Sequence, residues 1–251
     1  YHWNRKLKSL FELKRGILNG VATEWYENGK MQAKSFWSMG KEHGRQESWY
    51  ENGVKEAEMN FKNGKLNGSS IYWHRNGNIN KKTTFKNGGQ DGLLEVWYSN
   101  GGKKQVSFWK VGVMHGEVKH WHENGQLEET VIWEDGKTNG LLETWYPNGQ
   151  KKLRVMVKND LNEGLFQSWH KNGNKMIECN YINGKRVGTE KLWHENGQLR
   201  SKLNWVNGTQ IGLQKRFYPN GQIKMELDYV EDGIVSAKVW QLNGKPCPIS
   251  N

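Results

Sequence analysis

The chain is 251 residues long, which allows one or two domains, and only 35% of its residues are hydrophobic. Its two cysteines exclude a disulfide framework, and no apolar run is long enough for a transmembrane helix. The net charge of +11 favours acidic partners: an acidic protein, an anionic membrane surface or nucleic acid.

The first 19 residues begin in the middle of a repeated pattern. The segment Tyr1-His2-Trp3-Asn4-Arg5 lies 24 residues before Trp25-Tyr26-Glu27-Asn28-Gly29, with Arg5 in place of the glycine. We therefore expect residues 1–19 to form a partial repeat, which is either an amino-terminal cap or the cut end of a longer protein.

Residues 20–244 carry this pattern in tandem, with a period of 24 residues that shortens by one only in the last copy. Each copy opens with a glycine, reaches a Trp-Tyr or Trp-His pair, and closes one residue later with Asn-Gly. A fixed period of this length is typical of a repeat array. The constant residues are predicted to be structural: Trp25, Trp49, Trp73, Trp97, Trp121, Trp145, Trp169 and Trp193, with Gly29, Gly53, Gly77, Gly101, Gly125, Gly149, Gly173, Gly197 and Gly221.

Each copy predicts a β-hairpin. Residues 140–149 have the pattern of a strand and a tight turn, residues 150–157 have that of a second strand, and a looser turn follows. The segment Pro147-Asn148-Gly149 favours a type I turn that ends in a left-handed glycine, which makes a three-residue loop with a bulge.

The turn type also predicts a register. In a three-residue loop Trp145 pairs with Lys151 and Glu143 pairs with Leu153, so odd positions face odd positions. The odd positions of the second strand are the apolar ones, and the even positions carry lysine and glutamate. We therefore expect the tryptophans and the apolar residues to share one face, with the charged set on the other face.

Residues 245–251 are predicted to be a carboxy-terminal tail or cap, because Pro246 and Pro248 remove hydrogen-bond donors from any further strand. The predicted fold is all-β: an elongated single-sheet array of about ten hairpin repeats. We expect this sheet to be twisted and curled along its length, because a flat single layer would leave the tryptophan row in contact with water.

The chain resembles MORN-variant repeat proteins over residues 1–244. Two motifs carry the resemblance: G-x-x-x-x-W-[YH]-x-N-G, and an aromatic-x-x-G-x-x-x-G segment such as residues 61–68. The resemblance implies a hairpin-repeat sheet with a binding role, and it transfers no catalytic residues. The expected relatives are bacterial proteins named YwqK-type antitoxins, which are proposed to neutralise a partner toxin. The wider family is linked to protein scaffolding and to phospholipid binding.

Catalysis and metal binding are not expected. Histidines in equivalent positions of neighbouring repeats would lie about 9.5 Å apart, too far for two ligands of one ion. Glu47, Glu95 and Glu143 would lie about 19 Å apart, too far for a facing pair of catalytic carboxylates. Cys179 falls in the apolar row and is interpreted as a small buried hydrophobe. We therefore predict no enzymatic activity, no cofactor and no metal.

The predicted function is that of a non-catalytic protein-binding repeat module. Its partner would be a protein with acidic patches, and the chain would be either an antitoxin-like or immunity-like protein that neutralises a toxin, or a scaffold. The varied residues Ala22, Ser70, Val118 and Glu190 are interpreted as part of a recognition face. Tyrosine is enriched at binding hot spots, so the candidate partner-binding residues are Tyr26, Tyr50, His74, Tyr98, His122, Tyr146, His170, His194 and Tyr218.

The alternative function is binding to an anionic surface, with phospholipid favoured over nucleic acid. Glutamates such as Glu58 and Glu178 interrupt the basic pattern, which favours a protein partner with its own charge pattern. The compartment stays open, with the cytoplasm slightly favoured.

Overall fold

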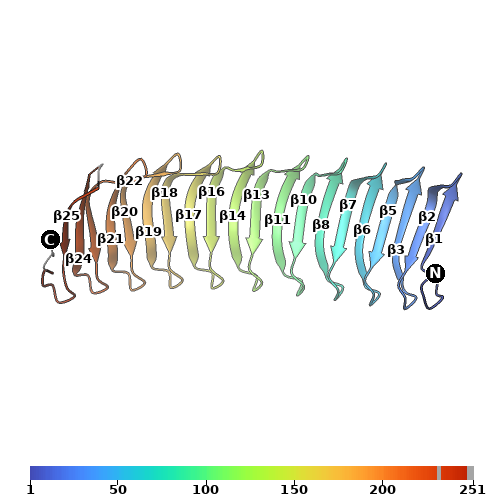
Figure 1. Cartoon of the computed structure of the whole chain (residues 1–251), viewed down its shortest axis with the longest axis horizontal. Coiled ribbons are helices and arrows are strands. Elements are labelled where there is room, and N and C mark those ends of the chain that lie inside the picture. Colours follow the sequence, from blue (N-terminus) through green and yellow to red (C-terminus); the bar gives the residue numbers. More distant parts are fainter. Residues whose placement is uncertain (231–232, 248–251) are drawn as a thin grey trace. The chain divides into compact units, whose positions relative to one another are not determined.

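The structure is a computed structural model that describes residues 1–230 and 233–247. Every regular element in these residues is a β-strand, and sequential hairpins pair antiparallel (Figure 1). The prediction of an all-β array of hairpin repeats is confirmed. The chain divides into two compact units, residues 1–125 and 126–251. Of the predicted tail, residues 248–251 lie outside the described part of the chain.

The first unit contains thirteen strands. Some repeats have one long first strand and others have a short and a longer piece in its place. The strands are β1 (Ser9–Lys14), β2 (Ile17–Trp25), β3 (Met31–Ser38), β4 (Lys41–Glu42), β5 (Gly44–Trp49), β6 (Lys55–Lys62), β7 (Lys65–Trp73), β8 (Ile79–Lys86), β9 (Gly89–Gln90), β10 (Gly92–Trp97), β11 (Lys103–Lys110), β12 (Val113–Met114) and β13 (Gly116–Trp121).

The second unit repeats this arrangement, and its described strands number twelve. They are β14 (Leu127–Glu134), β15 (Lys137–Thr138), β16 (Gly140–Trp145), β17 (Lys151–Lys158), β18 (Leu161–Trp169), β19 (Lys175–Ile182), β20 (Lys185–Trp193), β21 (Leu199–Val206), β22 (Thr209–Gln210), β23 (Gly212–Phe217), β24 (Ile223–Val230) and β25 (Gly233–Val239). The turns that follow each Trp-Tyr or Trp-His pair, called the Asn-Gly turns below, lie along one edge within each unit. The turns that connect one hairpin to the next lie along the opposite edge (Figure 1).

The Asn-Gly turn has the predicted form. The Tyr146 amide donates to the Gln150 carbonyl at 2.8 Å, and the Gly149 amide donates to the Tyr146 carbonyl at 2.8 Å. Gly149 has φ +83°, so this position needs the left-handed conformation that glycine adopts without strain. The same two bonds close the turn at residues 2–6, where Arg5 takes φ 67° in place of the usual glycine. The turn of the partial repeat at the start is therefore closed like that of a complete repeat.

The second connection is tighter than predicted. Lys62 pairs with Lys65, and the two residues between them, Asn63 and Gly64, have φ 53° and 78°. Two successive positive φ values make a two-residue type I′ turn, the form that best matches the twist of a hairpin. The expectation of a looser turn was wrong, because the Asn-Gly dipeptide that marks this turn lies inside a longer polar segment.

The predicted register was correct at the turn and wrong beyond it. Trp145 pairs with Lys151 as expected, but Thr144 pairs with Leu153, so Lys152 is an extra residue in the second strand. Glu143 consequently faces Arg154 and not Leu153. This β-bulge recurs in each repeat whose hairpin pairing is described, and one extra residue moves every later side chain to the opposite face.

The bulge gives each unit two different faces. We call the first the core face; it carries the even first-strand residues, such as Leu142, opposite the odd second-strand residues, such as Val155. We call the second the tryptophan face; it carries Trp145 with Glu143 and Arg154. The tryptophans therefore share a face with charged residues, and the expectation that they share the apolar face was wrong.

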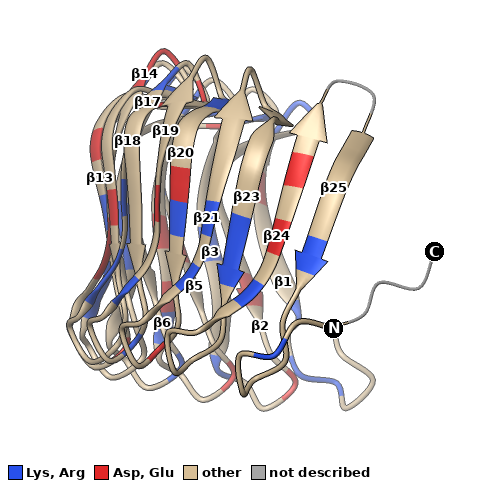
Figure 2. Ribbon diagram, turned by 90° about the vertical axis from the view of Figure 1, so that its left-hand side faces the viewer, with Lys and Arg blue, Asp and Glu red and all other residues tan. Residues whose placement is uncertain are grey.

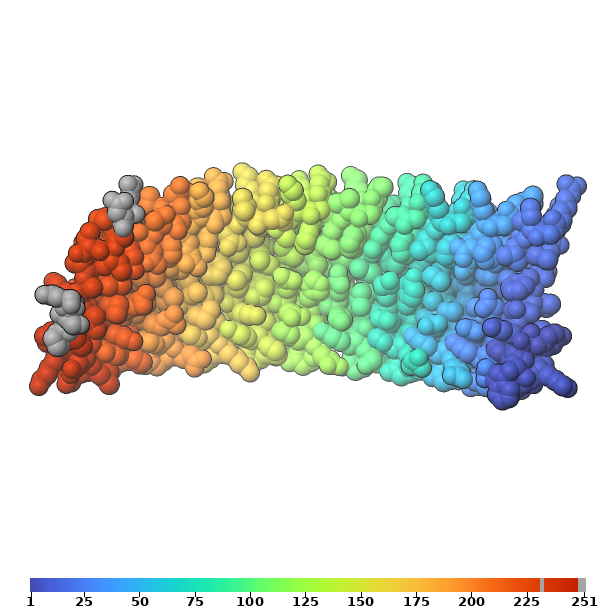
Figure 3. All heavy atoms as spheres, viewed as in Figure 1, coloured from blue at the N-terminus to red at the C-terminus, as the bar shows by residue number. Residues whose placement is uncertain are grey.

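The core face holds the most buried residues of the described chain. They alternate between the two strands of successive hairpins and are mostly small: Ala22, Ala57, Ser70, Thr83, Leu94, Ser107, Val118, Val131, Val155, Val157, Ser168, Cys179, Glu190, Ser201, Leu203 and Gln214. The strands bend along their length (Figure 2), and side chains of adjacent strands lie in contact within each unit (Figure 3). In the described residues these contacts, without a second layer, bury the core face.

Candidate functional site

The predicted anchor residues are half-buried and reach into the next repeat. The Tyr50 hydroxyl donates to the Trp73 carbonyl at 2.8 Å, and the Nε2 atom of His74 lies 3.0 Å from the Trp97 carbonyl. A carbonyl oxygen only accepts, so Nε2 of His74 carries the proton. The same bond is formed by His2, Tyr26, Tyr98, Tyr146, His170, His194 and Tyr218, while His122 is half-buried at the end of the first unit.

This geometry explains why tyrosine and histidine alternate at one position. Both side chains end in a donor that reaches the carbonyl of the equivalent tryptophan or its substitute one repeat later. The neighbouring asparagine adds a second link: the Asn148 side chain accepts from the Gln150 amide and donates to the Lys171 carbonyl. The Tyr/His row therefore connects repeats, and its role in partner binding stays a prediction.

The varied residues that we interpreted as a recognition face lie in the core. Ala22, Ser70, Val118 and Glu190 are all buried, and the Glu190 carboxylate accepts from the Trp205 indole at 2.9 Å. Arg186 lies 3.5 Å from the other oxygen of Glu190 and compensates its charge. The interpretation was wrong because it ignored the bulge, which places these residues opposite the apolar row of the second strand.

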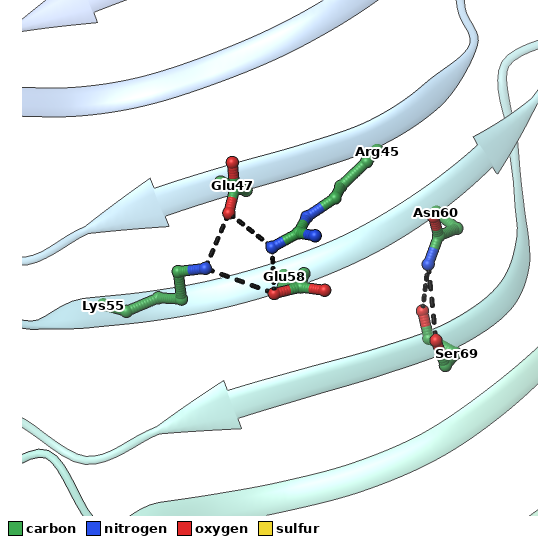
Figure 4. A network of polar contacts seen from close by, with 6 residues as sticks. All are labelled: Arg45, Glu47, Lys55, Glu58, Asn60 and Ser69. Carbon is green, nitrogen blue, oxygen red and sulfur yellow. Dashed lines mark hydrogen bonds and ion pairs between the residues drawn. The ribbon is translucent and has the colours of Figure 1, made fainter.

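The tryptophan face carries ordered charge networks. In the first unit Glu47 and Glu58 face each other across β5 and β6, where like charges would repel. Lys55 and Arg45 each bind both carboxylates, at 2.6 to 3.2 Å (Figure 4). The hydrogen bond from Lys55 lowers the pKa of Glu47. The Lys55 ammonium also lies 5.9 Å from the Trp49 ring and 5.6 Å from the Trp73 ring, so the network includes the tryptophans.

The second unit has similar ion pairs, one between β16 and β17 and one within β19. Glu143 binds Lys151 at 2.6 Å, and Lys151 lies 5.6 Å from the Trp145 ring. Lys175 binds Glu178, and this hydrogen bond lowers the pKa of Glu178. These carboxylates are neutralised by neighbouring lysines, so the tryptophan face presents mixed and balanced charge at this point.

An apolar patch lies beside this network on the tryptophan face of the second unit. Met156 is paired with Leu141, and Ile132 lies against Gly140, where an added Cβ would be 3.0 Å from Ile132 Cδ1. Leu165 follows on the next strand, β18. Ile132, Met156 and Leu165 are 43%, 47% and 47% exposed. A run of apolar side chains over four neighbouring strands marks a candidate interaction surface.

Cys179 is confirmed as a buried residue. Only 1% of it is exposed, and burial raises the pKa of its thiol to about 11. Among the described residues no group of three His, Cys, Asp or Glu side chains is arranged to hold a metal ion. The same residues contain no helix that is long and apolar enough to cross a membrane.

Sequence reasoning missed a cluster of three cations on the core face of the second unit. Arg200, Arg216 and Lys224 line one cavity there together with His194. Their side chains come from three strands, and only the register with its bulges brings them together. The available signal was the period itself, because Arg200 and Lys224 are 24 residues apart and occupy the same position of successive repeats.

Comparisons with known proteins identify the repeat. The family described as MORN repeat variant matches residues 18–38, 42–63, 66–87, 114–135, 138–159, 162–183, 186–207 and 210–231, which is more than half of the chain. The unmatched interval, residues 88–113, includes all of β10 and β11, which pair as in the other repeats. A comparison with curated proteins found no match.

One similar chain comes from the structure titled "Crystal Structure of TcdB2-TccC3-Cdc42". It is 9% identical, and the alignment covers 88% of this chain and 16% of that chain, with a TM-score of 0.17. This chain therefore spans a small part of that one, and a likeness of this level carries no argument about fold or function.

Proposed function

Because this chain belongs to the family of MORN repeat variants, which are non-catalytic modules that bind proteins or membranes, we propose that it binds another protein. The observation that carries the proposal is the apolar patch of Ile132, Leu141, Met156 and Leu165 on the tryptophan face. Soluble proteins rarely leave contiguous apolar surface in water unless it serves an interaction.

The charges around the patch support a protein over a lipid or a nucleic acid. Glu143, Lys151 and Arg154 form one network beside the patch, so both signs of charge border it. An apolar centre with a polar rim of mixed charge is typical of protein interfaces. A uniformly basic border would favour an anionic membrane or nucleic acid.

Within this class we propose that the protein masks a surface of its partner, as an antitoxin does. The physical support is that masking requires only shape and charge complementarity along several repeats, without chemistry. This role predicts that the purified protein inhibits its partner at a fixed stoichiometry. Scaffolding instead predicts that a bound partner keeps its activity.

The test is affinity capture from the native host, followed by calorimetry with the purified partner. The double variant Met156→Gln/Leu165→Gln should lose at least tenfold in affinity, because both exposed apolar contacts would become polar. Val206→Gln makes a similar change at an exposed residue of the same unit outside the patch. If Val206→Gln weakens binding as much as the double variant, the patch is not the binding surface.

The net charge of +11 favours one alternative, binding to an anionic surface. Liposome flotation and a nucleic-acid mobility shift distinguish this alternative from protein binding. Salt does not, because it weakens binding to a protein, to an anionic membrane and to nucleic acid alike. Tight binding to anionic liposomes, with no captured protein, would reject the proposed function.

A further inference from the structure

The core face of the second unit contains a cavity of about 340 Å³ between β20 and β24. Its lining combines the apolar residues Leu192 and Leu203 with three cations, Arg200, Arg216 and Lys224. Phe217, at the tryptophan position of its repeat, also borders the cavity. Small-molecule sites commonly have volumes of a few hundred Å³ and a mostly apolar lining with a few polar groups. The cavity has this composition at the lower end of the size range.

Two of the cations occupy bulge positions. Leu192 pairs with Ser201 and Trp193 pairs with Leu199, so Arg200 is the extra residue of its hairpin. Lys224 is the extra residue of the next hairpin by the same criterion. Arg216 lies between them, opposite Ser201 on one side and Met225 on the other. A bulge redirects the side chain of the extra residue.

No carboxylate compensates these three charges within the described residues. Glu190, a buried acid on the same face, is bound by Arg186 and Trp205. On the opposite face Glu226 is bound by Lys215 at 2.8 Å. The cavity therefore has a local charge of +3 from Arg200, Arg216 and Lys224, which an anionic ligand would neutralise.

Equivalent positions in the first unit have a different character. The residues that correspond to Arg200, Arg216 and Lys224 seven repeats earlier are Gln32, Ser48 and Glu56. There the Ser48 hydroxyl donates to the Glu56 carboxylate at 3.1 Å. The hairpin frame does not require cations at these positions, so the cluster reflects the particular sequence of the last repeats.

The number and type of cations indicate the ligand. A single carboxylate has one negative charge and can bind one arginine in a bidentate manner. A phosphate monoester has about two negative charges and three terminal oxygens, which matches two guanidinium groups and one ammonium. The apolar lining of Leu192 and Leu203 provides contact for the organic group of an ester.

We propose that this cavity is a binding site for the phosphate monoester of a small organic molecule, held by Arg200, Arg216 and Lys224. The site lies on the core face, opposite the surface assigned to the protein partner. Ligand binding there is therefore independent of the proposed function.

The test is isothermal titration of the full-length protein with phenyl phosphate, inorganic phosphate and benzoate. Phenyl phosphate should bind most tightly, since it combines the dianion with an apolar group. Inorganic phosphate should be weaker, and benzoate should be the weakest. Arg216→Gln and the double variant Arg200→Gln/Lys224→Gln should each reduce the affinity for phenyl phosphate by about tenfold or more. Arg216→Lys should also weaken binding, because lysine keeps the charge and loses the bidentate fork.

Lys202→Gln is the matched control. Lys202 lies on β21 like Arg200, but it is paired with Lys191 and Lys215 on the tryptophan face, and its removal changes the net charge equally. This variant should bind phenyl phosphate like the wild type. Equal weakening by Lys202→Gln and Arg216→Gln would show diffuse attraction and overturn the proposal. Benzoate that binds as tightly as phenyl phosphate would also overturn the proposal. The same holds if Arg216→Gln and Arg200→Gln/Lys224→Gln keep the wild-type circular dichroism and bind phenyl phosphate with unchanged affinity.

Discussion

At the scale of single residues, the type I′ turns show how the repeat tolerates departures from its pattern. The first turn residue is in the left-handed region in each described copy, with Asn63 at φ 53° and Asn183 at φ 50°. Asparagine adopts this conformation readily, but one copy has Val111 at φ 49°. A β-branched residue in this region is strained, so Val111 is a local weak point of the first unit.

We therefore predict that Val111→Asn stabilises the protein by about 1 kcal/mol. Val111 is 70% exposed, so the change removes little packing, and its amide keeps the bond to Asp91 at 3.0 Å. Urea unfolding followed by circular dichroism measures the effect as a higher midpoint. Asn183→Val should lower the midpoint by a similar amount, and a neutral result for both variants would contradict the strain argument.

The bond from Tyr50 to the next repeat separates a structural role from a binding role. Tyr50→Phe removes only the hydroxyl that donates to the Trp73 carbonyl, so we expect a loss of about 1 kcal/mol in unfolding free energy. Tyr1→Phe, at an exposed tyrosine, is the control. If Tyr50→Phe instead weakens partner binding while the unfolding midpoint is unchanged, the hydroxyl is a partner contact and the predicted anchor role is correct.

At the scale of elements, the sequence predicted the hairpin, its boundaries and the Asn-Gly turn, because proline, asparagine and glycine act locally on the backbone. It did not predict Lys152 as an extra residue, because a bulge depends on pairing between two strands and has no local sequence signal here. That one residue reversed the assignment of faces. It also explains why Ala22, Ser70 and Val118 are small or apolar at positions that seemed to vary freely.

The contacts of the candidate site could be predicted less well than the hairpins, because they too depend on pairing between strands. The constant step of 24 residues placed Tyr26 and Trp49 in successive repeats. The hydrogen bond between them forms only when both hairpins are folded, so the sequence did not predict it. Of the three cations of the cavity, Arg200 and Lys224 are one period of 24 residues apart, but Arg216 occupies a different position of the repeat. Two bulges and one cross-strand pairing bring them together.

The charge network between β5 and β6 predicts that the stability of the protein depends on pH. A hydrogen bond from Lys55 lowers the folded-state pKa of Glu47 below its ordinary value of 4.5. A lowered folded-state pKa gives stability that is present above the unfolded-state pKa and is lost as the pH falls through the folded-state pKa. We expect Glu47→Gln to be less stable than the wild type at pH 7 and to converge with it as the pH falls below the folded-state pKa of Glu47.

Thermal unfolding measured at a series of pH values from 7 downward follows that convergence. Glu27→Gln, at an exposed glutamate of an Asn-Gly turn, should follow the wild type throughout. A constant difference between Glu47→Gln and the wild type at all pH values would show that the substitution acts through packing and not through the ionised carboxylate.

At the scale of the whole molecule, stability in a repeat array is a sum over neighbouring repeats, so end strands open more often than interior strands. Within the second unit, one cysteine lies on an interior strand and the other lies after the last described strand. Cys179 lies on β19 among paired strands and is buried, whereas Cys247 lies beyond β25 and is half-buried. Their reactivity toward a thiol reagent therefore reports local opening at two different places.

We predict that an aromatic disulfide reagent labels Cys247 readily and Cys179 only when its repeat opens. Burial raises the pKa of Cys179 to about 11, so at neutral pH the reactive thiolate is scarce as well as inaccessible. In a Cys247→Ser variant, labelling of Cys179 should accelerate with urea over the range in which β-structure is lost. A Cys179→Ser variant gives the rate of the end site. Equal rates at both cysteines without denaturant would mean that β19 opens as easily as the chain end, contrary to additive stabilisation by neighbouring repeats.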